Sequence, residues 1–285
     1  MKTSYNPYIK EEGKKVFAPS FCVYFDILGF SDKISNIESD GLNYFNDYLK
    51  TLDNILKYLT KHNNYGDDNK HKRFELKIFT DNFVIGFPVN NDGETEFGEI
   101  FDVLSYIQYE FIKNNIFIKG AISFSNLYMD KNIVIGTALI DAYQLEEKYS
   151  IYPRIILSKE VSEKVNQYIN YFAEKKGCPE NKRCLIDKDG YYFINYLDFL
   201  MEHYIDNDDN EMYIEIENEL LLHKVKILEQ LELYFKNDRI FEKFVWLANY
   251  HNYFCKNFLN KKLYNLKNLI IHERNFKSIT RIIKI

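Results

Sequence analysis

The chain has 285 residues, is 46% hydrophobic and carries a net charge of −5, so it can form one large domain, or a catalytic domain with an extension. An acidic chain has no general attraction for phosphate polymers or anionic membranes, so we expect neither nucleic acid nor a membrane as its main partner. The opening segment MKTSYNPYIKEEGKK lacks the apolar run of a signal peptide, and no stretch is long enough to span a bilayer. We therefore expect a cytoplasmic protein whose scattered cysteines are reduced thiols.

Hydrophobic spacing predicts alternating strands and helices after a polar beginning. Continuous apolar runs indicate strands at 21–30, 73–89 (a hairpin), 116–129, 133–136 and 152–158. Apolar residues at helical spacing indicate helices at 32–61, 95–114, 137–149 and 159–172, with a polar loop at 62–72. This order predicts an α+β fold in which helices cover one mixed, mostly antiparallel sheet.

The last third of the chain has a different character. One more hairpin is predicted within 184–200, and long amphipathic helices are predicted at 211–237 and 239–260. The residues after these helices are basic, and a further helix is one interpretation of them. We therefore predict a polar arm at 1–19, a main domain at 20–200 and a helical extension at 201–285.

Asp26 lies within the otherwise apolar run FCVYFDILGF, near the end of the strand that this run predicts. A carboxylate in that position is costly unless something cationic neutralises it. The next residues, Leu28, Gly29 and Phe30, can present backbone N–H groups to a phosphate at the start of the following helix, because the glycine opens the turn. The alternative is a strand-end aspartate that only caps a turn.

Asp81 lies in the turn of the predicted hairpin LKIFTDNFVIGF. Asp-Asn is ordinary turn chemistry, so this residue alone is weak evidence of a site. Adjacent strand ends would, however, bring Asp26 and Asp81 to one edge of the sheet, where the two carboxylates repel unless they share a metal. Because Mg²⁺ takes one or two carboxylates together with substrate phosphates, the pair predicts a metal site.

Four segments resemble class III nucleotidyl cyclases in the order of that family, over about residues 20–160. FDILGF and KIFTDNFVIGF resemble its two metal-binding segments, FIKGAISFS resembles its next core strand, and IVIGTALIDAYQLE resembles its glycine-led dimer-interface helix. The resemblance implies that Asp26 and Asp81 hold two Mg²⁺ or Mn²⁺ ions, with the carbonyl of Ile27 as a further ligand. It also implies a homodimer with sites shared across the interface.

The reaction that this resemblance implies is an attack of the ribose 3′-oxygen on the α-phosphate with release of pyrophosphate. One ion would activate the 3′-hydroxyl and the other would neutralise the triphosphate. Lys119 falls where the family has an arginine that grips the triphosphate. A lysine supplies that charge without the bidentate fork, and the alternative for Lys119 is an edge-strand lysine that faces water.

The positions that read purines in this family are changed. Ile140 replaces an asparagine that orients the ribose, and Gln144 replaces an arginine that stabilises the transition state. Lys77 matches the lysine of the adenine pocket, but the position of its polar partner is occupied by Ile133. The residues that bind metal in the family are therefore present, whereas those that recognise the purine and stabilise the transition state are replaced.

With further residues, this combination resembles the pyrimidine cyclases of the Pycsar antiphage systems. These residues are Ala138, Ala142, Tyr143, Glu146, Pro153, Arg154, Ile155 and the segment WLANYHN at 246–252. The resemblance implies synthesis of cUMP or cCMP from UTP or CTP after infection, and a separate effector protein that senses the product. Tyr143 would fill the volume that a smaller base leaves, and Arg154 is the candidate for the missing transition-state cation, with a structural ion pair as the alternative.

Two other functions remain open from the sequence. Lys77 favours an adenylyl cyclase with altered recognition residues, whereas the changes at Ile140 and Gln144 favour a non-catalytic cyclase-like regulator that binds nucleotide. In the extension, the aromatic residues around Trp246 are interpreted as core or dimer contacts, with the sensing of a phage component as the alternative. His251 is interpreted as a hydrogen-bonded interface histidine, because no residue near it in sequence completes a metal site.

Overall fold

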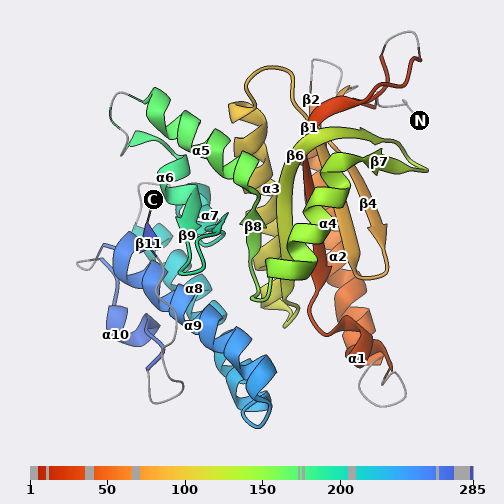
Figure 1. Cartoon of the computed structure of the whole chain (residues 1–285). Helices are drawn as coiled ribbons and strands as arrows, with labels where there is room; N and C mark the ends of the chain where they lie inside the picture. The colour runs from red at the N-terminus through yellow and green to blue at the C-terminus, as the bar shows by residue number, and fades with distance from the viewer. Residues whose placement is uncertain are drawn as a thin grey trace.

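The computed structural model describes residues 6–10, 13–35, 42–65, 71–172, 174, 177–204, 210–260, 263–272 and 283–284. Helices lie on both faces of one large sheet (Figure 1). Among the described residues the sheet has nine strands in the order β11-β9-β10-β8-β6-β1-β5-β4, with β7 also paired to β6. Only the β6–β8 pair is parallel. The predicted mixed, mostly antiparallel sheet of an α+β fold is thus confirmed.

The elements follow the predicted order closely. The strands of the main sheet are β1 Ala18–Ile27, β4 Glu75–Phe79, β5 Asn82–Pro88, β6 Ile118–Met129, β7 Val134–Gly136, β8 Ile155–Leu157, β9 Cys184–Ile186, β10 Tyr192–Ile194 and β11 Ile283–Lys284. The helices are α1 Phe30–Ser35, α2 Leu42–Asn63, α3 Glu94–Lys113, α4 Thr137–Tyr149, α5 Lys159–Tyr171, α6 Glu180–Arg183, α7 Asp198–Tyr204, α8 Asn210–Leu233, α9 Asp238–Phe258 and α10 Leu266–Leu269.

Three local expectations need correction. Within the helix expected at 32–61 the structure has two helices, α1 and α2, and residues 36–41 lie outside the described part. The loop expected at 62–72 contains a short pair of strands, β2 Asn64–Tyr65 and β3 His71–Lys72. Near the C-terminus, where a helix was one interpretation, α10 is a single turn and β11 pairs with β9 at the edge of the sheet. Pairing of this kind depends on a distant strand, so the local sequence does not reveal it.

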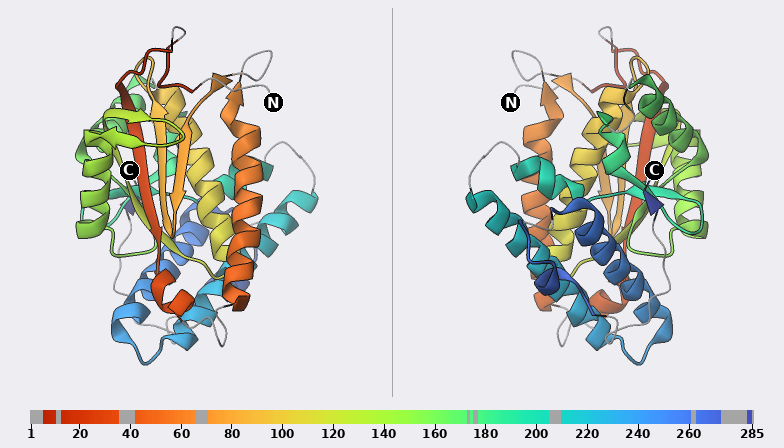
Figure 2. Two further views of the ribbon diagram at one scale, coloured as in Figure 1. Left: turned by 90° about the vertical axis from the view of Figure 1, so that its right-hand side faces the viewer. Right: turned by 90° about the vertical axis from the view of Figure 1, so that its left-hand side faces the viewer.

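The two faces of the sheet carry different cores, and Figure 2 shows the sheet between α4 on one side and α2 on the other. Alternate residues of β1, including Phe25 and Ile27, point into the large core that α2 and α3 cover. The residues between them, Cys22 and Tyr24, point into a smaller core beneath α4. This alternation follows from the two-residue period of a strand. It places Asp26 on the same face as Cys22 and Tyr24, the face that α4 covers.

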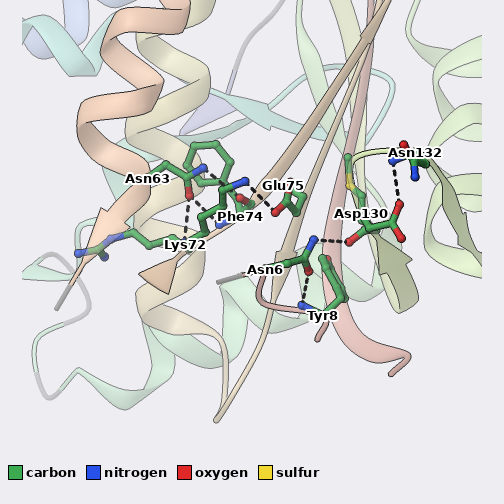
Figure 3. A network of polar contacts seen from close by, with 10 residues as sticks. Asn6, Tyr8, Asn63, Lys72, Phe74, Glu75, Asp130 and Asn132 are labelled. Carbon is green, nitrogen blue, oxygen red and sulfur yellow. Dashed lines mark hydrogen bonds and ion pairs between the residues drawn. The ribbon is translucent and has the colours of Figure 1, made fainter. Parts of the chain in front are cut away.

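The N-terminal residues pack against the sheet (Figure 3). Tyr8 is fully buried and its hydroxyl donates to Ser20 Oγ at 3.1 Å, while the Asn6 amide donates to the carbonyl of Met129 at 3.0 Å. Asp130 accepts a hydrogen bond from the backbone of Asn132 at 2.8 Å. The described residues of the predicted arm therefore contribute to the smaller core and end in the first residues of β1.

Helices α8 and α9 confirm the two long helices expected after residue 200. Their side chains belong to the same hydrophobic core as the main sheet, since Phe244 packs edge-on against Phe117 and Trp246 packs against Phe193. The division at residue 200 stays a prediction, but the segments on its two sides share one core. In the part of the chain that the structure describes, no helix has the length and apolar character needed to cross a bilayer.

Candidate functional site

The antiparallel pairing of β1 and β5 brings two acidic residues to the same edge of the sheet. Phe25 lies opposite Phe83 in this pair. One residue further along, the same register places Asp26 opposite Asn82. Asp81 precedes Asn82 in the turn that joins β4 to β5. Asp26 and Asp81 are 55 positions apart in the sequence. On the neighbouring strands they are therefore offset by about one residue.

Asp81 is fixed by its own turn. Thr80 has a left-handed backbone, with φ of 57°, and its hydroxyl donates to Asp81 Oδ1 at 2.7 Å. The Asn82 amide donates to the same oxygen at 3.1 Å. These local bonds hold one carboxylate oxygen inside the turn, and Oδ2 has no hydrogen-bond partner among the described residues.

Asp26 has one oxygen near a cation and one without a partner. Lys119 lies directly opposite it on β6, and the lysine Nζ is 3.5 Å from Asp26 Oδ2. Asp26 Oδ1 is buried and accepts no hydrogen bond from the described residues. A buried carboxylate oxygen without a partner is costly, so Asp26 Oδ1 is an atom that could accept a hydrogen bond or bind a cation.

Lys119 is shared between two carboxylates. Its ammonium also pairs with Glu146 of α4, whose side chain is almost fully buried. The alternative of an edge-strand lysine that faces water does not describe this residue, because its side chain is only 19% exposed. Glu146 takes up much of the lysine charge, which limits what Lys119 alone can offer to a phosphate group.

The electrostatics of Asp26 reflect this environment. Burial raises the pKa of Asp26 above its ordinary value, Lys119 opposes that rise, and the nearby carboxylate of Asp81 adds to it. The effect of Asp81 on the pKa of Asp26 agrees with the strand register, which places both residues at the same edge of the sheet. A cation bound between them would relieve both the repulsion and the cost of burial.

The residues at this edge fit a Mg²⁺ site in which the protein supplies only a few of the ligands. Among the described residues there is no group of three or more His, Cys, Asp or Glu side chains that could hold a metal ion. Mg²⁺, however, is commonly held by one or two carboxylates, with water and substrate phosphates as the other ligands. The free oxygens of Asp26 and Asp81 supply such a pair, whereas a structural site with only protein ligands is not present in the described residues.

The predicted phosphate-binding turn has a mixed outcome. The Leu28 N–H donates to the carbonyl of Phe117 at 2.8 Å, so this amide is not available to a phosphate and that part of the prediction is wrong. Gly29 has a left-handed backbone with φ of 72° and is exposed. The Phe30 ring packs on Tyr48 at 5.4 Å. The side chain of Ile27 points into the core, so only its carbonyl could serve as a ligand.

Lys77 and Tyr143 lie on the same face as Asp26. Lys77 is opposite Val84, which in turn is opposite Tyr24. The ring of Tyr143, on α4, packs edge-on against Tyr24 at 5.4 Å. Tyr24 also bonds through its hydroxyl to the side chain of Asn82, next to the acidic edge. Lys77 and Tyr143 therefore lie on the face that α4 covers, and Tyr24 links Tyr143 to the turn that carries Asp81.

Arg154 occupies a different environment. Its side chain is fully buried, and its two terminal nitrogens pair with Asp187 and Asp189. The guanidinium also lies 5.3 Å from the ring of Tyr152 and 5.5 Å from that of Trp246. Of the two interpretations open from the sequence, these contacts are those of the structural ion pair.

Sequence reasoning missed one cation of the site. Lys243, in the second turn of α9, is close enough to Asp26 to help lower the pKa of that carboxylate. No motif identifies it, since a lysine in an amphipathic helix is ordinarily a solvated residue. Its position depends on how the extension docks on the sheet, which the local sequence does not encode.

No known protein-family profile matches this sequence, and no curated protein matches it. Similar solved structures include the guanylyl cyclase Cya2, which is 12% identical with a TM-score of 0.38 over 52% of this chain and 79% of that chain. Another is a class III adenylyl cyclase-like ATP-binding protein from Pseudomonas aeruginosa, 12% identical with a TM-score of 0.37. That match covers 54% of this chain and 37% of the other. Similarities this distant do not identify what the chain binds.

Proposed function

We propose that this chain is a metal-dependent nucleotidyl cyclase that converts UTP or CTP into a 3′,5′-cyclic nucleotide and pyrophosphate. The observation that carries the proposal is the convergence of Asp26 and Asp81 at one sheet edge, with Asp26 Oδ1 buried and unpaired. A purely structural aspartate at a strand end would have its buried oxygen satisfied. A carboxylate left in this state in the free protein is typical of a site that waits for a ligand.

The chain's own residues would bind and orient the substrate. Asp26 and Asp81 would hold two Mg²⁺ or Mn²⁺ ions, which supply a lowered pKa for the ribose 3′-hydroxyl and neutralise the triphosphate. The 3′-oxygen then forms a bond to the α-phosphorus, the bond from that phosphorus to the bridging oxygen breaks, and pyrophosphate leaves. The rigid strands β1 and β5 contribute by fixing the two carboxylates before the substrate arrives.

A pyrimidine substrate is supported by the residues beside the acidic edge. The exposed α4 side chains Ile140 and Gln144 stand where the resembled purine cyclases have an asparagine and an arginine. Tyr143 adds a large ring near Tyr24, which suits a smaller base. By the same resemblance, the product is proposed as a second messenger in antiphage defence, sensed by a separate effector protein.

A homodimer is part of the proposal, because large apolar side chains are exposed on α4 and at the end of β4. Phe79 at the end of β4 is 52% exposed, and Ile140 and Tyr143 on α4 are 55% and 44% exposed. Large apolar groups clustered at one place on a surface are typical of interaction sites. A second copy of the chain would cover them and would bring further residues to the substrate.

An assay with all four nucleoside triphosphates in competition, with Mg²⁺ or Mn²⁺ and mass spectrometry of the products, tests the proposal. We expect cUMP or cCMP as the main product. Asp26→Ala and Asp81→Ala should each lower turnover by at least about 10²-fold, the scale of losing a group that stabilises charge in a transition state. Asp53→Ala is the matched control, because Asp53 is an exposed acidic residue of α2 that pairs with the exposed Lys57.

Two outcomes of this assay would redirect the proposal. If only cAMP forms, the enzyme is an adenylyl cyclase, which the position of Lys77 on the same face as Asp26 favours. If nucleotide binds without metal and no pyrophosphate is released, the chain is a non-catalytic regulator. The ion pairs of Arg154 favour that second candidate, since they engage the cation that was expected to stabilise the transition state.

A further inference from the structure

The start of α9 lies at the end of the sheet that carries the acidic edge. Figures 1 and 2 both place the turn between α8 and α9 at the same end of the molecule as α1, which follows Asp26. The ring of Phe244 packs edge-on against Phe117 at 4.9 Å, and Phe117 lies two residues before Lys119 in the sequence. Helix α9 is therefore anchored directly beside the strand that carries the site lysine.

A second anchor fixes the rotation of α9. The indole N–H of Trp246 donates to the buried carboxylate of Asp187 at 2.6 Å, and its ring stacks on Tyr152 at 5.6 Å. Residues three and four apart share a helix face, so Lys243 and Arg239 lie on the face that Trp246 turns toward the sheet. Phe244 and Trp246 thus hold the first turns of α9, which carry Arg239 and Lys243, beside the beginning of β6 and beside Tyr152.

Lys243 is only partly exposed, and it makes no hydrogen bond or ion pair with the residues that the structure describes. Burial lowers its pKa, the positive charges of Lys119 and Arg239 lower it further, and Asp26 opposes this. Three cationic groups are therefore close enough to influence one another. Lys119 is neutralised by Glu146, whereas Lys243 has no such partner.

A partly buried ammonium that forms no ion pair with the described residues is costly, and the nearby cations increase that cost more than Asp26 reduces it. A protein of net charge −5 has many carboxylates that could have been placed there. The arrangement is consistent with an anion that arrives from outside. The two aspartates of the acidic edge are suited to metal ions, and Lys243 is suited to an anion. Together these groups suit a polyphosphate with bound metal ions.

We propose that Lys243, assisted by Arg239, binds the terminal phosphates of the nucleoside triphosphate. The helical extension is then a part of the substrate site and not a separate sensing module. This inference rests on the proposed cyclase function, but it concerns a residue outside every segment that resembles the cyclase family. The alternative is that Lys243 only balances the charge of Asp26 across the site.

Binding of tripolyphosphate to the full chain in the presence of Mg²⁺, measured by isothermal titration calorimetry, tests this inference without turnover. We expect Lys243→Gln to weaken binding by about 10-fold, the scale of one charge-assisted contact, and Lys243→Arg to restore most of it. Lys256→Gln is the matched control, since Lys256 is an exposed lysine at the other end of the same helix. This control should bind like the unchanged protein.

The possible results of this titration separate the inference about Lys243 from the cyclase proposal. If Lys243→Gln binds tripolyphosphate as tightly as the unchanged protein, the inference is wrong, whatever the enzyme does. If the unchanged protein binds no tripolyphosphate, the inference fails, and the four-nucleotide assay decides the cyclase proposal separately. If Lys243→Gln weakens binding but no nucleotide is cyclised, only the cyclase proposal fails. Thermal unfolding checks that each variant folds, and Arg239→Gln, expected to weaken binding in the same direction, replaces Lys243→Gln if that variant does not.

Discussion

Asp26 illustrates how a single residue can reduce stability for the sake of a site. Its side chain is partly buried at the same sheet edge as Asp81, and its buried oxygen Oδ1 has no partner among the described residues. Residues placed for function in this way commonly destabilise the free protein, and their neutral replacements stabilise it. A neutral residue in place of Asp26 is therefore expected to raise stability and to lower activity.

We predict that Asp26→Asn raises the free energy of unfolding by about 0.5–2 kcal/mol while it abolishes cyclisation. The amide keeps the shape of the side chain but removes the charge that Asp81 repels. Urea unfolding of the metal-free protein measures the first effect, and the four-nucleotide assay measures the second. A variant that loses stability would mean that the carboxylate is structural.

Arg154 is the opposite case, a charged residue that the structure uses to hold the fold together. Its guanidinium is fully enclosed by aromatic rings and neutralised by Asp187 and Asp189. Removal of one partner of a buried ion pair leaves a buried charge without compensation, which costs about 3–5 kcal/mol.

We therefore predict that Arg154→Met lowers the free energy of unfolding by that amount. Below its unfolding temperature, the variant should keep a turnover per folded molecule within about 3-fold of the unchanged enzyme, because the 10²-fold losses typical of transition-state groups should not occur. Thermal unfolding and assays at low temperature separate the two effects. A large loss of turnover with unchanged stability would restore Arg154 as the transition-state cation.

At the scale of elements, a chain of buried polar groups joins the helices of the extension. Tyr196, next to α7, bonds to His223 Nε2 at 2.8 Å, and His223 Nδ1 lies 2.9 Å from His251 Nδ1. His251 Nε2 reaches the carbonyl of Leu269 at 3.0 Å. A carbonyl only accepts, so His251 donates from Nε2 and accepts at Nδ1, which makes His223 donate from Nδ1 and accept from the tyrosine. Both histidines are neutral in this chain of bonds.

The neutral histidines predict a loss of stability in mild acid. Burial lowers the pKa of His223 well below its ordinary value and lowers that of His251 to about 4. Both groups take up protons more readily in the unfolded chain, so their stability contribution is complete above pH 6.5 and is lost as the pH falls toward 4. Each histidine should contribute a slope of about 1.4 kcal/mol per pH unit within this window.

Urea unfolding at several pH values between 7 and 5 measures this effect before most carboxylates titrate. His71→Gln is the control, because His71 is exposed and its replacement should leave the slope unchanged. A free energy of unfolding that stays constant from pH 6.5 to pH 5 would contradict the assignment of two neutral histidines.

At the scale of the whole molecule, the main sheet and the helical extension depend on one another. Phe244, Trp246 and Tyr250 of α9 are buried in the same core as Phe117 and Phe193. The C-terminal strand β11 also pairs with β9. A boundary drawn from composition at residue 200 therefore passes through a continuous core.

We predict that a fragment of residues 1–200 does not fold cooperatively, because it exposes the apolar surface that α8 and α9 cover. In the full chain, Trp246→Ala should lower the free energy of unfolding by about 3–5 kcal/mol, as is usual for a buried tryptophan. Circular dichroism during heating and gel filtration measure both effects. A monodisperse fragment with a sharp unfolding transition would establish 1–200 as an independent domain.

Much of the fold and part of the site were predictable from local patterns. The apolar run that contains Asp26 and the turn that contains Asp81 are both where the sequence places them, because strand periodicity and turn chemistry are properties of neighbouring residues. The amide of Leu28 was assigned wrongly, since its bond to Phe117 joins residues that are distant in sequence. Lys243 was missed for the same reason.

By itself, the sequence determined the type and order of most elements, and it predicted that two carboxylates at strand ends form the centre of a site. Only the tertiary structure decided which charges meet: Glu146 neutralises Lys119, Asp187 and Asp189 pair with Arg154, and the docking of α9 lets Lys243 influence the pKa of Asp26. The physical reason is that helices and turns form through contacts close in sequence, whereas ion pairing and burial depend on strand register and on helix docking. These are set by residues far apart in the chain.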